Sequence, residues 1–256
     1  MLSYQHIYHA GNAADLHKHA LLAWMLDYLT AKDKPLSYLE THAGRGLYDL
    51  TAPEAEKTGE AKAGIVRMEE MFPATHPYRR ALNAVRAAHG PDAYPGSPLI
   101  AAHFLRAADR MRLAELHPQE HAALRTALPG AAVDRRDGAE MALAACPPDP
   151  RRGLLLIDPS WEVKTDYRTI PDLVQKLHRK WNVGVILLWY PLLATTPHRA
   201  MVADLAGAIP DALVHEVTFP PARPGHGMAG SGLFVVNPPW GLAGELARIT
   251  AIFAAL

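Results

Sequence analysis

The run Leu154-Leu-Leu-Ile157, followed at once by Asp158-Pro-Ser-Trp161, is the feature that most constrains how this chain folds. Four consecutive aliphatic residues are typical of a strand buried on both faces, as in parallel sheets covered by helices on both sides. A carboxylate and an aromatic ring at the carboxyl end of such a strand can hold a planar ring that bears an amino group. The acid accepts from the amino group, and the aromatic ring stacks on the face. The motif therefore predicts an α/β fold and a site for an adenine or a cytosine taken out of a base stack.

A second motif, Asn237-Pro-Pro-Trp240, competes for the same role. It follows the apolar run Leu233-Phe-Val-Val236 and matches the pattern of acid or amide, proline, proline and aromatic residue at every position. The first motif departs from that pattern at Ser160. Local sequence does not separate the two motifs, so the choice depends on the order of the strands.

Composition limits the class of protein. The chain has 256 residues, 49% hydrophobic and 20% charged, which suits one large α/β domain with an insertion. A single cysteine, no signal-like N-terminus and no apolar run of membrane length predict a cytoplasmic protein without a membrane segment.

The 26 basic and 26 acidic residues balance, which argues against binding of long nucleic acid except through local basic clusters. These clusters are His17-Lys-His19, Arg79-Arg80, Arg135-Arg136 and Arg151-Arg152. We expect no metal, because no CxxC or HExxH accompanies the N-terminal histidines.

The pattern of apolar runs predicts seven strands with helices between or after them. The expected strands are 36–40, 111–114, 131–133, 153–157, 183–189, 212–219 and 231–236. The expected helices lie near 15–31, 99–108, 167–181, 197–207 and 241–254, with Asn12 or Asp15 capping the first. The fourth strand would lie beside the first, at the switch point where ligands bind. This order favours Asp158 as the reactive acid and makes Asn237-Pro-Pro-Trp240 a rigid turn that ends the last strand.

An insertion explains an unusual spacing after the first strand. The loop with Gly44 and Gly46 is followed by a candidate ribose-binding acid, Glu115, only about seventy residues later, whereas roughly twenty is usual. Without residues 47–93, Gly96 would stand 19 residues before Glu115. We therefore expect a main domain of residues 1–46 and 94–256 and an inserted helical subdomain of residues 47–93. Ser97 is predicted to cap the helix that follows the insertion.

Motifs spread over nearly the whole chain resemble the RlmJ family of bacterial 23S ribosomal RNA adenine-N6 methyltransferases. They are Met1-Leu-Ser-Tyr4, His9-Ala-Gly-Asn12, Lys18-His19, Thr41-His-Ala-Gly44, Tyr94-Pro-Gly-Ser-Pro98, Glu115-Leu-His-Pro118, Asp166-Tyr167, Leu188-Trp-Tyr-Pro191, Gly227-Met-Ala-Gly-Ser-Gly232 and Asn237-Pro-Pro-Trp240. The resemblance implies a Rossmann-like class I methyltransferase: a seven-stranded, mostly parallel sheet with helices on both faces and a small inserted helical subdomain. It implies S-adenosylmethionine as cofactor and 23S ribosomal RNA, naked or partly assembled, as partner. We expect a monomer without a protein partner.

The resemblance also implies the site residues. The predicted cofactor contacts are Lys18, His19, His42, Gly44, Ser97, Glu115, Asp137, Gly138 and Asp158. Glu115 would bind the ribose hydroxyls, Ser97 the carboxylate of the cofactor, and Asp137 its adenine amino group. Their structural alternatives are a plain helix cap for Ser97 and a turn acid for Asp137; His19 and His42 would otherwise be polar residues satisfied near the core.

The predicted chemistry is methyl transfer to the exocyclic nitrogen of an adenine. The Asp158 carboxylate and the Pro159 carbonyl would accept its two hydrogens, Trp161 would stack on the base, and Tyr4 would meet the RNA. Ser160 replaces the second proline of the family pattern, which would loosen this turn. Three alternatives stay open: a DNA adenine-N6 methyltransferase, a cofactor-binding protein with weakened catalysis, and a NAD-dependent oxidoreductase.

Overall fold

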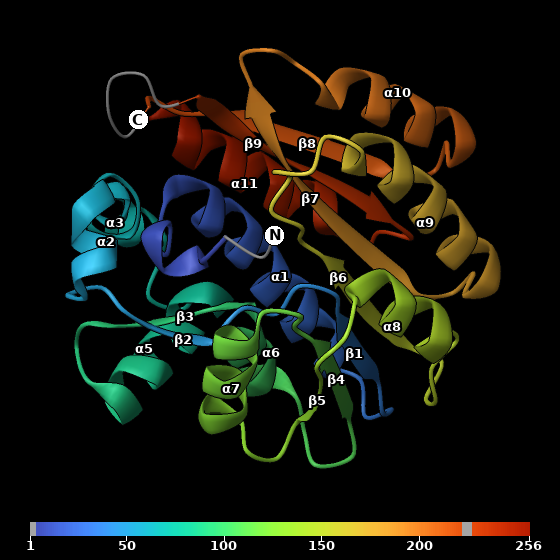
Figure 1. Cartoon of the computed structure of the whole chain (residues 1–256), viewed down its shortest axis with the longest axis horizontal. Helices are drawn as coiled ribbons and strands as arrows, with labels where there is room; N and C mark the ends of the chain where they lie inside the picture. The colour runs from blue at the N-terminus through green and yellow to red at the C-terminus, as the bar shows by residue number, and fades with distance from the viewer. Residues whose placement is uncertain (1–3, 222–226) are drawn as a thin grey trace.

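The apolar runs form one seven-stranded sheet in the order β5-β4-β1-β6-β7-β9-β8 (Figure 1). The computed structural model describes residues 4–221 and 227–256, so Met1-Leu-Ser of the first resemblance motif lies outside the described residues. The strands are β1 (Ser37–Glu40), β4 (Arg110–Ala114), β5 (Ala132–Asp134), β6 (Gly153–Ile157), β7 (Val185–Leu193), β8 (Leu213–Thr218) and β9 (Met228–Val236). Among the described strands of this sheet, β9 runs opposite to the other six. The mostly parallel Rossmann-like fold of class I methyltransferases is confirmed.

Helices cover both faces of this sheet. Those outside residues 47–93 are α1 (Ala13–Thr30), α6 (Ser97–Phe104), α7 (Pro118–Ala127), α8 (Gly138–Ala145), α9 (Asp166–Lys180), α10 (His198–Ala208) and α11 (Leu242–Ala254), with a 3-10 turn, η1 (His6–Tyr8), before α1. Figure 1 shows α8, α9 and α10 on one face, and α1 and α11 on the other. Successive β6 side chains alternate between the two cores: Leu156 belongs to the core with α1, and Ile157 to the core with α8 to α10. Within the described residues, no helix is long and apolar enough to cross a membrane.

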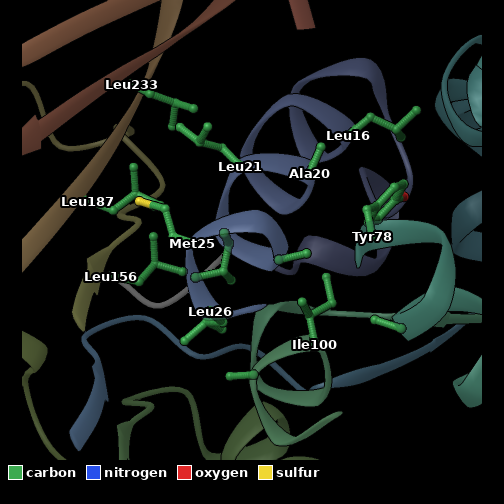
Figure 2. Close-up of a cluster of buried hydrophobic side chains, with 14 of the residues drawn as sticks. Leu16, Ala20, Leu21, Met25, Leu26, Tyr78, Ile100, Leu156, Leu187 and Leu233 are labelled. Atoms are coloured by element: carbon green, nitrogen blue, oxygen red, sulfur yellow. The ribbon is translucent and has the colours of Figure 1, made fainter. Parts of the chain in front are cut away.

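Helix α1 is buried nearly all round. Its cap is as predicted, because the Asn12 side chain accepts from the Asp15 N–H at 2.8 Å. Leu21 and Met25 face the sheet, while Leu16 and Ala20 lie on the side of Tyr78, which comes from residues 47–93 (Figure 2). The second layer of protein over α1 is why even its polar residues are enclosed. Each fully buried Leu or Met contributes about 1.5–3 kcal/mol of hydrophobic stabilisation.

Residues 47–93 leave and rejoin the main chain at adjacent points. The Gly96 N–H donates to the Gly46 carbonyl at 2.7 Å, and β2 (Leu47–Asp49) pairs antiparallel with β3 (Ala93–Pro95). Between them lie α2 (Pro53–Thr58), α3 (Glu60–Ala63), α4 (Ile65–Met68), the 3-10 turn η2 (Glu69–Met71) and α5 (Pro77–His89). Their apolar side chains share the core cluster of α1. That this segment is a subdomain of its own stays a prediction.

The predicted cap of α6 is wrong. Gly96 occupies the cap position and Ser97 is already the first helical residue, with Pro98 second. The Ser97 hydroxyl instead donates to Glu40. Helix α6 also ends at Phe104, four residues before the predicted end, because Leu105 has an extended backbone.

Candidate active site

A cavity of about 600 Å³ opens at the carboxyl ends of the parallel strands, where ligands bind in open α/β sheets. Every residue predicted for the site lines it: Tyr4, Lys18, His19, His42, Gly44, Ser97, Glu115, Asp137, Gly138, Asp158, Pro159 and Trp161. They come from the first turns of α1, the loop after β1, the start of α6 and the ends of β4, β5 and β6. The fold thus brings together residues that lie as far apart in the sequence as Tyr4 and Trp161.

A buried ion cluster fixes the acid of the first motif. The Lys18 ammonium donates to Asp158 Oδ2 at 2.5 Å and lies 3.1 Å from Asp15 Oδ1. Lys18 is 4% exposed, so this cation is held by the two carboxylates rather than by water. Burial alone would lower the pKa of Lys18, but Asp158 and Asp15 raise it well above its ordinary value. A positive charge therefore stands beside Asp158 across the physiological pH range.

Asp15 links this cluster to the mouth of the cavity. Burial alone would raise the pKa of Asp15, yet His6, Lys18 and His19 hold it well below its usual range. The ionised carboxylate accepts from His6 Nε2 at 2.9 Å, and His6 Nδ1 lies 2.9 Å from the Tyr4 hydroxyl. The Tyr4 ring stacks on His9 at 5.6 Å between ring centroids. Tyr4 is therefore held in position at the cavity by a chain of polar contacts that leads to Asp158.

Glu115 presents a carboxylate that backbone donors already orient. Its Oε2 accepts from the Gly44 N–H at 2.8 Å, and its Oε1 accepts from the His117 N–H at 2.7 Å. Burial raises the pKa of Glu115 above its ordinary value, against these two hydrogen bonds. Each oxygen can still accept a further hydrogen bond, which suits a pair of ribose hydroxyls.

A deeper layer of polar groups lies behind the loop after β1. Glu40, fully buried at the end of β1, accepts from the Ser97 hydroxyl at 2.5 Å and from the Tyr38 hydroxyl at 2.7 Å. Burial raises the pKa of Glu40 to about 8, despite both hydrogen bonds. His19 Nδ1 lies 3.0 Å from the Tyr94 hydroxyl, and burial lowers the pKa of His19 to about 3. His19 is therefore neutral, and Glu40 is protonated near neutral pH.

The far end of the cavity carries Asp137 and Gly138. Asp137 is exposed, and its Oδ1 accepts from the Glu140 N–H at 3.0 Å, which caps α8. The alternative that Asp137 is only a turn acid thus applies in part, because Oδ1 caps α8. Its other oxygen, Oδ2, can still accept a hydrogen bond. A Cβ at Gly138 would lie 2.0 Å from the Thr41 carbonyl, so only glycine lets the two loops meet here. His42 is exposed on the same wall, with its Nδ1 2.7 Å from the Thr41 hydroxyl.

Trp161 lines the cavity but is mostly enclosed. Its side chain is 5% exposed, its ring centroid lies 4.6 Å from that of Tyr167, and its indole N–H donates to the Trp189 carbonyl at 3.1 Å. Trp161 also has a positive φ of 59°, which is unusual for a bulky residue. Stacking of a base on this ring stays a prediction, and the contacts seen here anchor the turn after β6.

The competing motif, Asn237-Pro-Pro-Trp240, lies at the end of the strands opposite to the cavity. Because β9 is antiparallel to β7, its last residue is followed by Asn237 near the amino end of β7. The Asn237 amide donates to the carbonyls of Asn182 and Gly184 at 3.0 and 2.8 Å. This agrees with the predicted role of the motif as a turn that ends the last strand.

The expected N-terminal basic cluster is not a surface feature. His17, Lys18 and His19 are all at most 4% exposed, because α1 is covered on both sides. Arg79 and Arg80 are paired with acidic residues, and Arg152 donates to backbone carbonyls. The cluster His17-Lys-His19 therefore forms no basic patch on the surface, although Lys18 reaches the cavity.

Sequence reasoning missed other residues of the cavity wall, and three of them contact the predicted ones. His6 and Asp15 complete the polar chain from Tyr4 to Lys18, and Trp189 lies beside Lys18. Asp15, Lys18 and His19 stand at i, i+3 and i+4, a spacing that places them on one side of a helix and would have indicated Asp15. Trp189 lies within the strand beside that of Asp158, and its signal in the sequence was its place in the resemblance motif Leu188-Trp-Tyr-Pro191.

Comparisons with known proteins show the family of the chain. A family model described as "Ribosomal RNA large subunit methyltransferase D, RlmJ" matches residues 33–255. The "Ribosomal RNA large subunit methyltransferase J" of Escherichia coli is 38% identical, over 97% of this chain and 91% of the relative. The protein of the same name from Haemophilus influenzae is 37% identical, over 97% and 92%.

Solved structures share the fold of this chain. A crystal structure of a Legionella pneumophila protein has a TM-score of 0.85 and 34% identity, covering 95% of this chain and 92% of that one. A probable spermidine synthase from Corynebacterium glutamicum has a TM-score of 0.52 at 10% identity, covering 91% and 70%. The second likeness concerns the fold alone.

Proposed function

Because the chain belongs to the RlmJ family of ribosomal RNA large subunit methyltransferases, we propose that it methylates the exocyclic N6 of an adenine in 23S ribosomal RNA. The observation that carries this proposal is the place of Asp158. Its carboxylate ends β6 in a large cavity, beside the Pro159 carbonyl and paired with buried Lys18. An acceptor pair of this kind suits an amino group that carries two hydrogens.

The residues around the cavity fit S-adenosylmethionine as cofactor. The two Glu115 oxygens, each with one backbone donor, have acceptor capacity left for ribose hydroxyls, and the second Asp137 oxygen can accept from an adenine amino group. Ser97 and the neutral His19 line the cavity near the start of α6, where a carboxylate would be favoured. When bound, the cofactor supplies a methyl group on a positively charged sulfur. Lys18, His42, Gly44 and Gly138 complete the proposed set.

Asp158 and Pro159 would prepare the amino nitrogen for attack. The lone pair of this nitrogen is delocalised into the adenine ring, which makes it a poor nucleophile. Hydrogen bonds from its two hydrogens to the Asp158 carboxylate and the Pro159 carbonyl favour the pyramidal nitrogen that can react. The nitrogen must also lose one proton, which the Asp158 oxygen is placed to accept. Correct alignment of donor and acceptor would supply most of the acceleration.

The remaining predicted contacts concern the RNA. Tyr4, held by His6 and His9, stands at the cavity as the proposed RNA contact. Trp161 would present to the base only the small part of its ring that is exposed. Ser160 restores a backbone N–H and some freedom in this turn, which is the basis of the alternative that binds cofactor with weakened catalysis.

A substrate comparison tests the proposal. The protein and S-adenosylmethionine are incubated with unmodified 23S ribosomal RNA transcript or with duplex DNA of the same sequence, and transferred methyl groups are counted. We expect transfer to the RNA at least about tenfold faster than to the DNA. Preference for the DNA would support the DNA methyltransferase alternative. Cofactor binding by calorimetry without transfer to either substrate would support the alternative of weakened catalysis, and binding of NAD in place of S-adenosylmethionine would contradict the proposal.

A further inference from the structure

We propose that Trp189 supplies a face on which the target adenine stacks, and that Ser231, His17 and His215 hold its ring in place. This inference rests on the proposed function, since it assumes that a nucleobase enters the cavity. Trp189 lines the cavity and is only partly buried, whereas Trp161, the ring that the motif indicates, is 5% exposed. Of these two indoles, Trp189 has more surface to offer a base.

Trp189 stands next to the reactive acid. Leu188 of β7 pairs with Ile157 of β6, so Trp189, the next residue in β7, stands level with Asp158, which follows β6. The Lys18 ammonium that binds Asp158 also lies 5.5 Å from the Trp189 ring centroid, within the range of a cation–π contact. A base whose amino group reaches Asp158 would therefore lie within contact of this indole.

A buried chain of hydrogen bonds fixes the edge of the ring. The Trp189 indole N–H donates to Ser231 Oγ at 2.9 Å, and Ser231 Oγ lies 2.8 Å from His17 Nδ1. His17 Nε2 lies 2.8 Å from His215 Nδ1, and His215 Nε2 lies 2.8 Å from the Thr250 hydroxyl. That hydroxyl donates to the Leu246 carbonyl in α11 at 2.9 Å.

The hydrogen bonds from Trp189 to Leu246 run in one consistent direction, from donor to acceptor. An indole N–H can only donate and a backbone carbonyl can only accept, so every group between them accepts once and donates once. Both histidines are then neutral with the proton on Nε2. Burial lowers the pKa of His17 and of His215, which agrees with neutral rings. The indole is thus tied across the sheet to the C-terminal helix.

The Trp189 ring is already oriented before a base stacks on it. A free aromatic side chain loses conformational entropy when a base stacks on it, whereas a ring already fixed by Ser231 loses less. Stacking of one base on one aromatic ring contributes about 1–3 kcal/mol. The segment Gly227-Met-Ala-Gly-Ser-Gly232, which the resemblance included without a role, supplies Ser231 for this purpose.

Two substitutions of Trp189 separate stacking from packing. Leucine fills space without a π-face, and phenylalanine keeps a face without the N–H. With 23S ribosomal RNA transcript as the varied substrate, we expect Trp189→Leu to lower kcat/KM by about 5- to 150-fold, from the stacking energy above. Trp189→Phe should lose clearly less than Trp189→Leu, and both should bind S-adenosylmethionine within about twofold of the wild type. Equal activity of the two variants would overturn the inference.

The support of the ring is tested with Ser231→Ala. Loss of one hydrogen bond is expected to raise the KM for the RNA about three- to tenfold with little change in kcat. It should also shift the emission of Trp189, taken as the difference between each protein and its Trp189→Phe counterpart. A merely structural Ser231 would lower thermal stability and leave KM and this emission unchanged, which would overturn its assigned role.

These results are distinguishable from failure of the proposed function. If the wild type transfers no methyl group to adenine, the proposed function fails. If the wild type is active and Asp158→Ala is not, but Trp189→Leu matches Trp189→Phe, only the inference about Trp189 fails.

Discussion

Lys18 Nζ donates to Asp158 Oδ2 at 2.5 Å across 140 residues of sequence, and this contact joins the first helix to the reactive end of β6. Lys18 also stands between Asp158 and Asp15, two carboxylates that would otherwise repel each other inside the protein. The contact places a positive charge beside Asp158 and holds one of its oxygens in a hydrogen bond. The site depends on the position of α1 as much as on the motif after β6.

Lys18→Met keeps the length of the side chain and removes its charge. Because it removes the cation from buried Asp15 and partly buried Asp158, we expect a loss of about 3–5 kcal/mol in the free energy of unfolding. Methyl transfer should fall at least about 100-fold, since Asp158 would lose the hydrogen bond that fixes its position. Denaturant unfolding and initial rates measure the two effects, with exposed Lys164→Met as control. A folded variant with wild-type rates would show that Lys18 does not act on Asp158.

Glu115→Gln tests the cofactor site without touching Asp158. Each Glu115 oxygen accepts from a backbone N–H, of Gly44 or of His117. In the variant, the amide NH₂ would replace one of these oxygens and would face an N–H, so that hydrogen bond would be lost. A hydrogen bond to a charged group contributes about 1.5–3 kcal/mol, so the Kd for S-adenosylmethionine should rise about tenfold or more. Calorimetric titration measures this. Glu162→Gln, which alters an acid of the same cavity outside the predicted cofactor contacts, should bind normally. An unchanged Kd for Glu115→Gln would remove Glu115 from the site.

Glu40 makes stability depend on pH. Its pKa is about 8 in the folded protein and ordinary in the unfolded chain, so between about pH 4.5 and 8 the folded state holds a proton that the unfolded state has lost. The contribution is fully present below about pH 4.5 and is lost as the pH rises to about 8, by at most about 1.4 kcal/mol per pH unit. Glu40→Gln removes this term. Relative to the variant, the wild type should therefore become less stable from pH 5 to pH 8 in denaturant titrations.

The control for Glu40 is Glu140→Gln, an exposed acid on α8, which should leave the pH dependence of the wild type intact. If the stability of Glu40→Gln followed that of the wild type in parallel from pH 5 to pH 8, the carboxyl would be ionised in the folded protein and the assignment would be wrong.

Asn237→Ala separates the two competing motifs. The Asn237 amide binds two carbonyls at the edge opposite the cavity, and its φ of 51° disfavours alanine. We expect a loss of about 1–3 kcal/mol in stability, with methyl transfer within about twofold of the wild type at a temperature where the variant is folded. Thermal unfolding and initial rates measure this. Inactivation of the folded variant would mean that the wrong motif has been assigned to the chemistry.

Much of the fold follows from local sequence, and the finer parts of the site do not. The run before Asp158 predicts a central strand because four aliphatic residues require burial on both faces, and the interval between Gly46 and Glu115 predicts an insertion. The partner of Lys18 depends on how α1 packs against β6, which no local pattern encodes. The burial of His17-Lys-His19 has the same origin, since distant segments cover these residues: Ser231, His215 and Phe253 contact His17, and Tyr94 contacts His19. Ser97 matches a cap by type, but Glu40 lies close enough to take its hydroxyl.

The most direct test of the account is to identify the methylated nucleoside. Unmodified 23S ribosomal RNA is incubated with S-adenosylmethionine carrying a deuterated methyl group and with either the wild type or Asp158→Ala. The RNA is then digested to nucleosides and analysed by mass spectrometry. The account predicts labelled N6-methyladenosine with the wild type, and a loss of at least about 100-fold with Asp158→Ala while S-adenosylmethionine still binds. Label in another nucleoside, or N6-methyladenosine formed equally well by Asp158→Ala, would contradict it.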